Sequence, residues 1–287
     1  MAAVVPALLS AVLAVLATRP KLAAKVFGPG ERRVWHPSDL ELDSTDVEYR
    51  PGSQAWWIPA PAAVGAVVIV HGYEPTIDPR STDPGPRLEL ASMLHTHGFA
   101  SLIVNLGYAS GSHLHSGGAL EADDIADGVE WVRNRSGLPV AVIGFSAGGH
   151  ASIAATSRCS PFAVVTDSSF VDFSEVATDQ GSLLLRLPRS VFGLTTALMR
   201  LMTGHRPINL ESDLADIDTP MLHIHGDADT AISHQNLQRI AAVTGGETYS
   251  VAGADHVDGF RVDPIGYEAA LIRFLTRAVA SERPGTP

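Results

Sequence analysis

Hydrophobic residues in this chain gather in short runs that alternate with longer stretches of helical spacing. The clearest run, Ala66-Val-Val-Ile-Val70, is unbroken and typical of a strand buried on both faces of a sheet. Apolar residues recur at helical spacing in residues 87–97, 121–134, 147–157, 233–243 and 267–280. Seven further segments have the length and composition of strands: residues 46–50, 55–59, 100–105, 140–144, 162–167, 220–225 and 247–251. Strands that alternate with helices predict a mostly parallel α/β sheet, which opens with an antiparallel hairpin at residues 46–59.

One segment, residues 172–213, interrupts this alternation. It lies between two predicted strands and is too long for a simple connection. Apolar residues within it share helical spacing, namely Val191, Leu194, Leu198, Leu201 and Met202. The segment therefore predicts either a small helical cap over the carboxyl edge of the sheet or one more packing helix. We expect three parts in the chain: an N-terminal helix at residues 1–34, a domain at residues 35–281 with a cap at about 172–213, and a polar tail at residues 282–287.

The amino terminus is uncharged and apolar over residues 2–17 and is followed by basic residues. A helix of that length spans roughly 24 Å, slightly short of the bilayer core of about 30 Å. Three interpretations remain open: a membrane anchor, a signal peptide cleaved after Ala17, or an apolar helix packed on the domain or on a membrane surface. The first predicts a membrane-associated protein whose domain is cytoplasmic. The others predict a secreted protein or a soluble cytoplasmic one.

Composition and charge narrow the partners that the chain can have. Its 287 residues are 45% hydrophobic and 18% charged, enough for a folded domain with a sizeable core. The formal net charge is -11, and an acidic surface repels phosphate backbones, so we expect no nucleic-acid partner. The chain has a single cysteine, and its histidines lack the spacing of metal ligands. We therefore expect neither a metal nor a cofactor.

The strongest chemical signal is the sequence Gly144-Phe-Ser146-Ala-Gly148, which joins the strand at residues 140–143 to a helix. A serine at a strand-to-helix turn, with glycine two residues away on each side, is the nucleophile elbow G-x-S-x-G. The turn is too sharp for side chains at the glycine positions, and the helix amino terminus favours developing negative charge. Ser146 is the predicted nucleophile, and the backbone N–H of Ala147 is a predicted oxyanion donor.

A serine hydroxyl needs a base, and the base needs a carboxylate to fix its tautomer. His256 lies just after the last predicted strand, and Asp227 and Asp229 follow the strand at residues 221–224. The nucleophile, the carboxylates and the base all fall at carboxyl ends of predicted parallel strands, where open α/β sheets place their sites. The order Ser, Asp, His differs from that of chymotrypsin and of subtilisin. Either carboxylate satisfies the pattern.

From about residue 35 to 275, the chain resembles the α/β-hydrolase superfamily. The resemblance is carried by Ala55-Trp-Trp-Ile-Pro59, Val70-His-Gly72, the elbow, His225-Gly-x-x-Asp229 and Asp255-His256. Within the superfamily, the chain is most similar to the membrane-associated branch of Bem46-like and ABHD13/17-like serine hydrolases. The resemblance implies an eight-stranded α/β-hydrolase fold. It also implies Asp229 as the acid and the backbone N–H of Tyr73 as the second oxyanion donor.

Motifs and resemblance together predict a serine hydrolase that cleaves small-molecule esters or thioesters through an acyl-enzyme. An acyltransferase, a serine peptidase and a non-catalytic binding protein on the same scaffold remain alternatives. We expect Tyr73 and the cap residues Phe192, Leu194 and Leu198 to bind an apolar acyl chain. Residues 105–117 depart from the pattern of the relatives, so substrate preference does not carry over from them.

Overall fold

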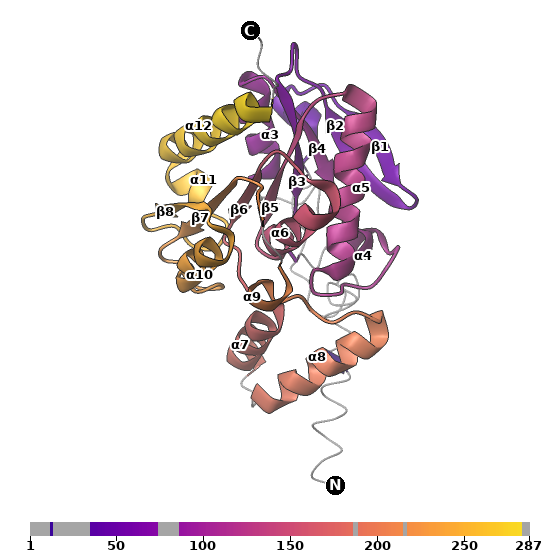
Figure 1. Cartoon of the computed structure of the whole chain (residues 1–287), viewed down its shortest axis with the longest axis vertical. Coiled ribbons are helices and arrows are strands. Elements are labelled where there is room, and N and C mark those ends of the chain that lie inside the picture. Colours follow the sequence, from indigo (N-terminus) through magenta and orange to yellow (C-terminus); the bar gives the residue numbers. More distant parts are fainter. Residues whose placement is uncertain (1–11, 14–34, 74–85, 186–188, 215–216, 283–287) are drawn as a thin grey trace.

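The computed structural model describes residues 12–13, 35–73, 86–185, 189–214 and 217–282. One eight-stranded sheet forms its centre, with strand order β1-β2-β4-β3-β5-β6-β7-β8 (Figure 1). The first two strands pair antiparallel, and all pairs from β4 to β8 are parallel. The strands are β1 (Thr45–Arg50), β2 (Ser53–Ile58), β3 (Gly65–Val70), β4 (Phe99–Val104), β5 (Val140–Phe145), β6 (Val164–Asp167), β7 (Met221–Gly226) and β8 (Glu247–Val251). The predicted sheet and its opening hairpin are confirmed.

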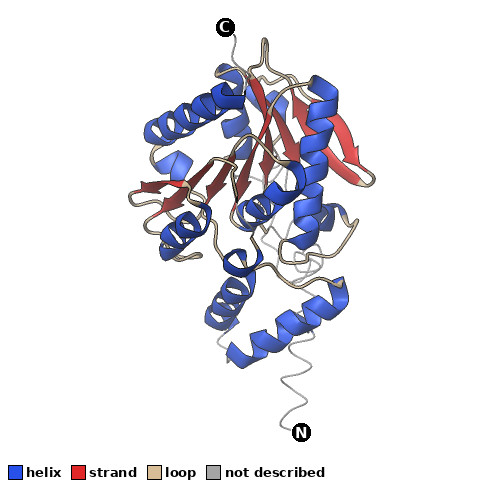
Figure 2. Cartoon of the chain, viewed as in Figure 1, coloured by secondary structure: helices blue, strands red, loops and turns tan. Residues whose placement is uncertain are grey.

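Helices cover both faces of the sheet (Figure 2). One face packs against α3 and α12, and the other packs against α5, α6 and α10. Central strands are buried on both sides, so side chains of β3 alternate between the two cores: Val67 and Ile69 face one, Val68 and Val70 the other. The helices are η1 (Pro37–Leu40), α3 (Arg87–Thr96), α4 (Gly107–Ser110), α5 (Ala119–Ser136), α6 (Ala147–Cys159), α7 (Phe173–Leu185), α8 (Arg189–Thr203), α9 (Leu210–Asp213), α10 (Gln235–Thr244), α11 (Gly259–Val262) and α12 (Pro264–Glu282).

The five helices predicted from hydrophobic spacing are all present, with small differences at their ends. The sequence did not predict η1, α4, α9 and α11. Each has four residues, about one turn, which is too short for a helical period to show.

The segment at residues 172–213 leaves the sheet after β6 and returns before β7. It holds α7, α8 and α9, and Figure 1 shows α7 and α8 together at one end of the molecule. Its two ends are tied to each other, because Asp172 and Asn209 form a β-bridge and Asn209 Nδ2 donates to Asp172 Oδ2 at 2.8 Å. Next to the bridge, Phe173 N–H donates to the carbonyl of Ile208. The segment therefore leaves the sheet and returns to it with its two ends in contact.

Among the residues that the structure describes, no helix is both long and apolar enough to cross a membrane. The apolar stretch predicted at residues 2–17 lies outside the described residues, except for Val12 and Leu13. The three interpretations of the amino terminus, and the locations that they imply, stay predictions.

Candidate active site

Ser146 occupies the turn between β5 and α6, and its backbone is strained. Its φ and ψ are 52° and −121°, a conformation that residues with side chains rarely adopt. The flanking glycines are needed for steric reasons. A Cβ on Gly144 would lie 2.5 Å from the carbonyl oxygen of Gly148, and a Cβ on Gly148 would lie 2.2 Å from that of His71. The strand-to-helix turn therefore has the geometry that the sequence motif requires.

The structure brings Ser146, His256 and Asp229 together in a line. His256 Nε2 lies 3.1 Å from Ser146 Oγ, and His256 Nδ1 lies 2.9 Å from Asp229 Oδ2. The Asp229 side chain is fully buried, whereas the His256 side chain is 28% exposed. Because an ionised carboxylate can accept hydrogen bonds but not donate them, Nδ1 carries the ring hydrogen. The lone pair of Nε2 then faces the serine hydroxyl.

Asp229 is held by four donors at two oxygens. Its Oδ1 accepts the backbone N–H groups of Ala231 at 2.9 Å and Ile232 at 2.7 Å. Its Oδ2 lies 2.9 Å from His256 Nδ1 and 3.1 Å from His225 Nε2. Burial raises the pKa of Asp229, but the hydrogen bonds from His225 and His256 outweigh that effect and hold the pKa well below its ordinary value. Asp229 is therefore ionised at neutral pH.

The neighbouring carboxylates brace the loops that carry the acid and the base. Asp227 is exposed, and its Oδ1 accepts the backbone N–H of Gly253 at 2.6 Å. Asp255 Oδ1 accepts the N–H groups of Thr230 and His256, both at 2.8 Å. Of the two candidate acids, the structure thus brings Asp229 and not Asp227 to the imidazole of His256.

The segment from Asp167 to Ser169, after β6, contacts both the nucleophile and the base loop. Ser146 N–H donates to the carbonyl of Asp167 at 2.8 Å, and Ser169 Oγ donates to the carbonyl of Ser146 at 3.1 Å. Ser168 Oγ accepts the N–H of Val257, the residue after His256, at 3.0 Å. Ser168 and Val257 have φ values of 53° and 58°, so the strain at this site extends beyond the elbow. Sequence reasoning missed this segment, whose one signal is a polar end to a buried strand.

Asp167, the first residue of this segment, has a buried carboxyl group. Its Oδ2 accepts the hydroxyl of Tyr267 and its Oδ1 accepts that of Ser168, both at 3.0 Å. Burial raises the pKa of Asp167 to about 6, although these two hydrogen bonds act in the opposite direction. Burial therefore favours the protonated form of this carboxyl group more than in an exposed aspartate.

The loop after β3 lies against Ser146, where the second oxyanion donor is predicted. A Cβ on Gly72 would lie 3.0 Å from Ser146 Cβ. His71 fixes this loop, since its Nε2 accepts the N–H of Leu106 at 3.1 Å and its Nδ1 therefore donates to the carbonyl of Gly72 at 2.7 Å. Tyr108 Oη donates to the same carbonyl at 2.8 Å. Both predicted donors, the amides of Tyr73 and Ala147, thus belong to segments beside the nucleophile.

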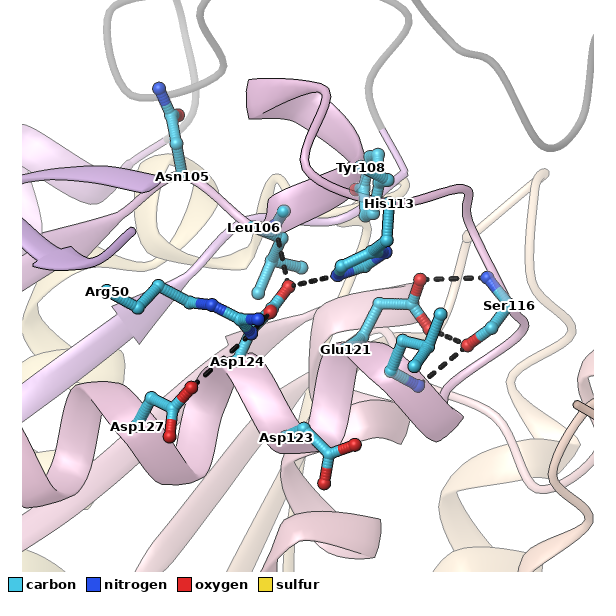
Figure 3. A network of polar contacts seen from close by, with 12 residues as sticks. Arg50, Asn105, Leu106, Tyr108, His113, Ser116, Glu121, Asp123, Asp124 and Asp127 are labelled. Carbon is cyan, nitrogen blue, oxygen red and sulfur yellow. Dashed lines mark hydrogen bonds and ion pairs between the residues drawn. The ribbon is translucent and has the colours of Figure 1, made fainter. Parts of the chain in front are cut away.

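Two acidic residues of α5 anchor the loop at residues 105–118 (Figure 3). Asp124 Oδ2 accepts the N–H of Gly107 at 2.6 Å and lies 2.8 Å from His113 Nε2, and Asp124 Oδ1 pairs with Arg50. Glu121 accepts the N–H and the hydroxyl of Ser116 and the N–H of Gly118. Two acidic side chains of one helix therefore hold the loop, which contains α4, on both sides of that short helix.

The anchored loop presents His115 to a group of aromatic rings. The ring of His115 lies 5.1 Å from that of Tyr73, 4.7 Å from that of Tyr108 and 5.2 Å from that of Phe173, the first residue of α7. His115 is buried, and burial lowers its pKa, which favours the neutral ring. We call these four residues the aromatic cluster. It links Tyr73 to the first helix of the inserted segment, a contact that the sequence did not predict.

The predicted acyl-binding residues of α8 differ in exposure. Phe192 is buried, Leu198 is half-buried and Leu194 is 41% exposed. Their predicted contact with an acyl chain stays a prediction. No group of three or more potential metal ligands stands together among the residues that the structure describes.

No family model matches the chain, and no curated protein matches it in sequence. Solved structures do match. The esterase PF2001 of Pyrococcus furiosus has a TM-score of 0.67 at 22% identity, over 87% of this chain and 96% of its own. Est1E of Butyrivibrio proteoclasticus has a TM-score of 0.58 at 14% identity, over 83% and 99%. XC6422 of Xanthomonas campestris, an α/β serine hydrolase without a lid, has a TM-score of 0.53 at 18% identity, over 86% and 97%.

These similarities show that the chain has the α/β-hydrolase fold, as predicted. At such identities they establish the fold and not the activity. The narrower resemblance to the Bem46-like branch stays a prediction.

Proposed function

We propose that the chain is a serine hydrolase that cleaves carboxylic esters or thioesters through an acyl-enzyme. The observation that carries the proposal is the line from Ser146 through His256 to Asp229, with contacts of 3.1 and 2.9 Å, at a strained elbow that opens a helix. Among the matched structures, PF2001 is named as an esterase and XC6422 as an α/β serine hydrolase, which agrees with this reaction class.

In the first step, Ser146 Oγ attacks the carbonyl carbon of the substrate while His256 Nε2 takes the hydroxyl proton. The unprotonated Nε2 already faces Oγ, so no tautomer change is needed. The new imidazolium is stabilised by the ionised Asp229. The backbone N–H groups of Tyr73 and Ala147 donate to the oxyanion, and the amino terminus of α6 adds its favourable dipole.

In the second step, His256 gives the proton to the leaving oxygen or sulfur, and the acyl group stays on Ser146. Water then attacks the acyl-enzyme while the same Nε2 takes a proton from it. Collapse of the second tetrahedral intermediate releases the carboxylic acid and returns the proton to Oγ. All proton transfers pass through one nitrogen, and none requires a cofactor.

We further propose that the acyl chain binds between the cap and Tyr73. The apolar residues of α8, with Phe192, Leu194 and Leu198 among them, support an apolar acyl group. Acyl transfer to an alcohol or thiol would share the first step, so product analysis must accompany any rate measurement.

The proposal is tested with a fluorophosphonate probe on the purified full chain. Wild-type protein is expected to be labelled and to hydrolyse p-nitrophenyl esters and acyl thioesters to free acids, while Ser146→Ala is expected to do neither. Ser212→Ala, which removes an exposed serine elsewhere, serves as the matched control. Labelling of Ser146→Ala to the wild-type level, or a wild type that is neither labelled nor active, would overturn the proposal.

A further inference from the structure

A second imidazole, that of His225, reaches the carboxylate oxygen that contacts the base. His225 Nε2 lies 3.1 Å from Asp229 Oδ2, and His256 Nδ1 lies 2.9 Å from the same atom. His225 sits at the carboxyl end of β7 and is 1% exposed. The mechanism above gives this buried, titratable side chain no proton to move.

The direction of the His225 hydrogen bonds follows from its two neighbours. Nε2 also lies 3.0 Å from the carbonyl oxygen of Ile232, which can only accept. The ionised carboxylate of Asp229 can also only accept. Nε2 therefore carries a hydrogen, and that hydrogen is shared between the two oxygens.

These contacts close a small ring of hydrogen bonds. The N–H of Ile232 donates to Asp229 Oδ1 at 2.7 Å, while the carbonyl of Ile232 accepts from His225. His225 belongs to β7, whereas Asp229 and Ile232 belong to the loop after it. The imidazole thus fastens the acid loop to the end of the rigid sheet.

We propose that His225 is a positioning residue that aims Asp229 Oδ2 at His256, an inference that rests on the proposed function. The N–H groups of Ala231 and Ile232 hold Oδ1 in place. They do not fix the rotation of the carboxylate, so Oδ2 could still move. With His225 present, Oδ2 has a second donor, from the strand side, and the carboxylate plane is fixed. Without His225, the described contacts leave Oδ2 with His256 as its donor. The carboxylate can then turn, and the imidazole of His256 loses an acceptor in a fixed position.

Strand β7 offers a matched control in His223. It lies two residues before His225, so it points to the same face of the strand, and it is also 1% exposed. Its ring nitrogens contact the hydroxyls of Thr166 and Thr244 and not the acid. A variant at His223 therefore reports the cost of losing a buried histidine from β7 without disturbing Asp229.

The experiment compares His225→Leu, His225→Gln and His223→Leu on a p-nitrophenyl ester, with thermal unfolding followed by circular dichroism. His225→Leu is expected to lower kcat by roughly 10-fold to 100-fold, the effect of losing a hydrogen bond to a buried charge, while KM stays within about twofold. His225→Gln, whose amide N–H replaces Nε2–H, is expected to recover most of kcat. His223→Leu is expected to lower the melting temperature and to leave kcat within about threefold.

Each remaining outcome decides the question. If His225→Leu and His223→Leu lower kcat equally, or if His225→Gln gives no recovery, His225 acts through stability and the inference is wrong. If His225→Leu does not fold, His225→Asn replaces it, because that shorter amide does not reach Asp229 and must lose the activity that glutamine retains. Ser146→Ala is measured in parallel: an inactive Ser146→Ala beside a fully active His225→Leu refutes this inference alone, whereas an active Ser146→Ala refutes the proposed function.

Discussion

Replacing Asp229 with asparagine is expected to reverse the hydrogen-bond pattern of the site while keeping its shape. In the native chain, Oδ1 accepts the N–H groups of Ala231 and Ile232. An asparagine must place its carbonyl oxygen there, because its NH₂ group cannot accept. The NH₂ group then takes the place of Oδ2 and faces His256 Nδ1, a donor against a donor.

His256 escapes this conflict by moving its ring hydrogen from Nδ1 to Nε2. The nitrogen that faces Ser146 Oγ, at 3.1 Å, then already carries a hydrogen and cannot take the serine proton. Loss of the correct tautomer in a triad of this kind costs about 10⁴-fold in kcat. At 1.36 kcal/mol for each factor of ten, that is about 5 kcal/mol of transition-state stabilisation.

The assay is kcat and KM for p-nitrophenyl acetate at neutral pH, with circular dichroism to verify folding. Asp227→Asn is the control, since asparagine keeps an acceptor for the N–H of Gly253 and the side chain is exposed. It is expected to stay within about threefold of the wild type. The tautomer argument is refuted if Asp229→Asn retains more than about a tenth of kcat, or if Asp227→Asn is the more damaging change.

Three further predictions concern the elbow, the buried carboxyl group and the acyl chain. Gly148→Ala is expected to abolish fluorophosphonate labelling, because its Cβ would lie 2.2 Å from the carbonyl oxygen of His71; labelling at the wild-type rate would contradict the tight turn. Burial raises the pKa of Asp167 to about 6, so the folded chain holds a proton that the unfolded chain releases above about pH 4. The free energy of unfolding in urea is therefore expected to fall as the pH rises from about 4 to about 6, by a step that Asp167→Asn lacks; equal pH dependence in both proteins would rule this out. Across p-nitrophenyl esters from acetate to decanoate, kcat/KM is expected to rise nearly fourfold per methylene, at ~0.8 kcal/mol each, until the pocket is full; a flat series would show that α8 serves packing.

The sequence predicted the sheet well because its buried strands are unbroken apolar runs, as β3 shows. It also predicted the elbow, because steric demands at Gly144 and Gly148 leave a direct trace in residue type. The choice between Asp227 and Asp229 was different. Both follow β7 and both are carboxylates, so the residues themselves left the choice open, and it rested on the resemblance until the loop geometry was known.

Other parts of the site left only a weak trace in the sequence, such as the polar end of β6. The contacts of His225 and of the segment from Asp167 to Ser169 depend on side-chain direction at strand ends, which spacing does not encode. The inserted segment shows the same limit, because helical spacing in α8 predicts an apolar stripe without saying what it faces. Leu194 and Val191 belong to one stripe, yet Leu194 is 41% exposed and Val191 is buried.

The hydrogen bond between His256 and Ser146 joins residues 110 positions apart in the chain, and that between His256 and Asp229 joins residues 27 apart. The contact with Ser146 requires β5, β6, β7 and β8 to have paired side by side, and such long-range parallel pairing is the slow part of folding. The hydrogen bonds within helices such as α5 and α6 join residues four apart, so these helices can form before the site is complete. During refolding, labelling of Ser146 by fluorophosphonate should therefore recover later than the helical circular dichroism signal. The time at which Ser146 becomes reactive thus reports when the sheet is complete.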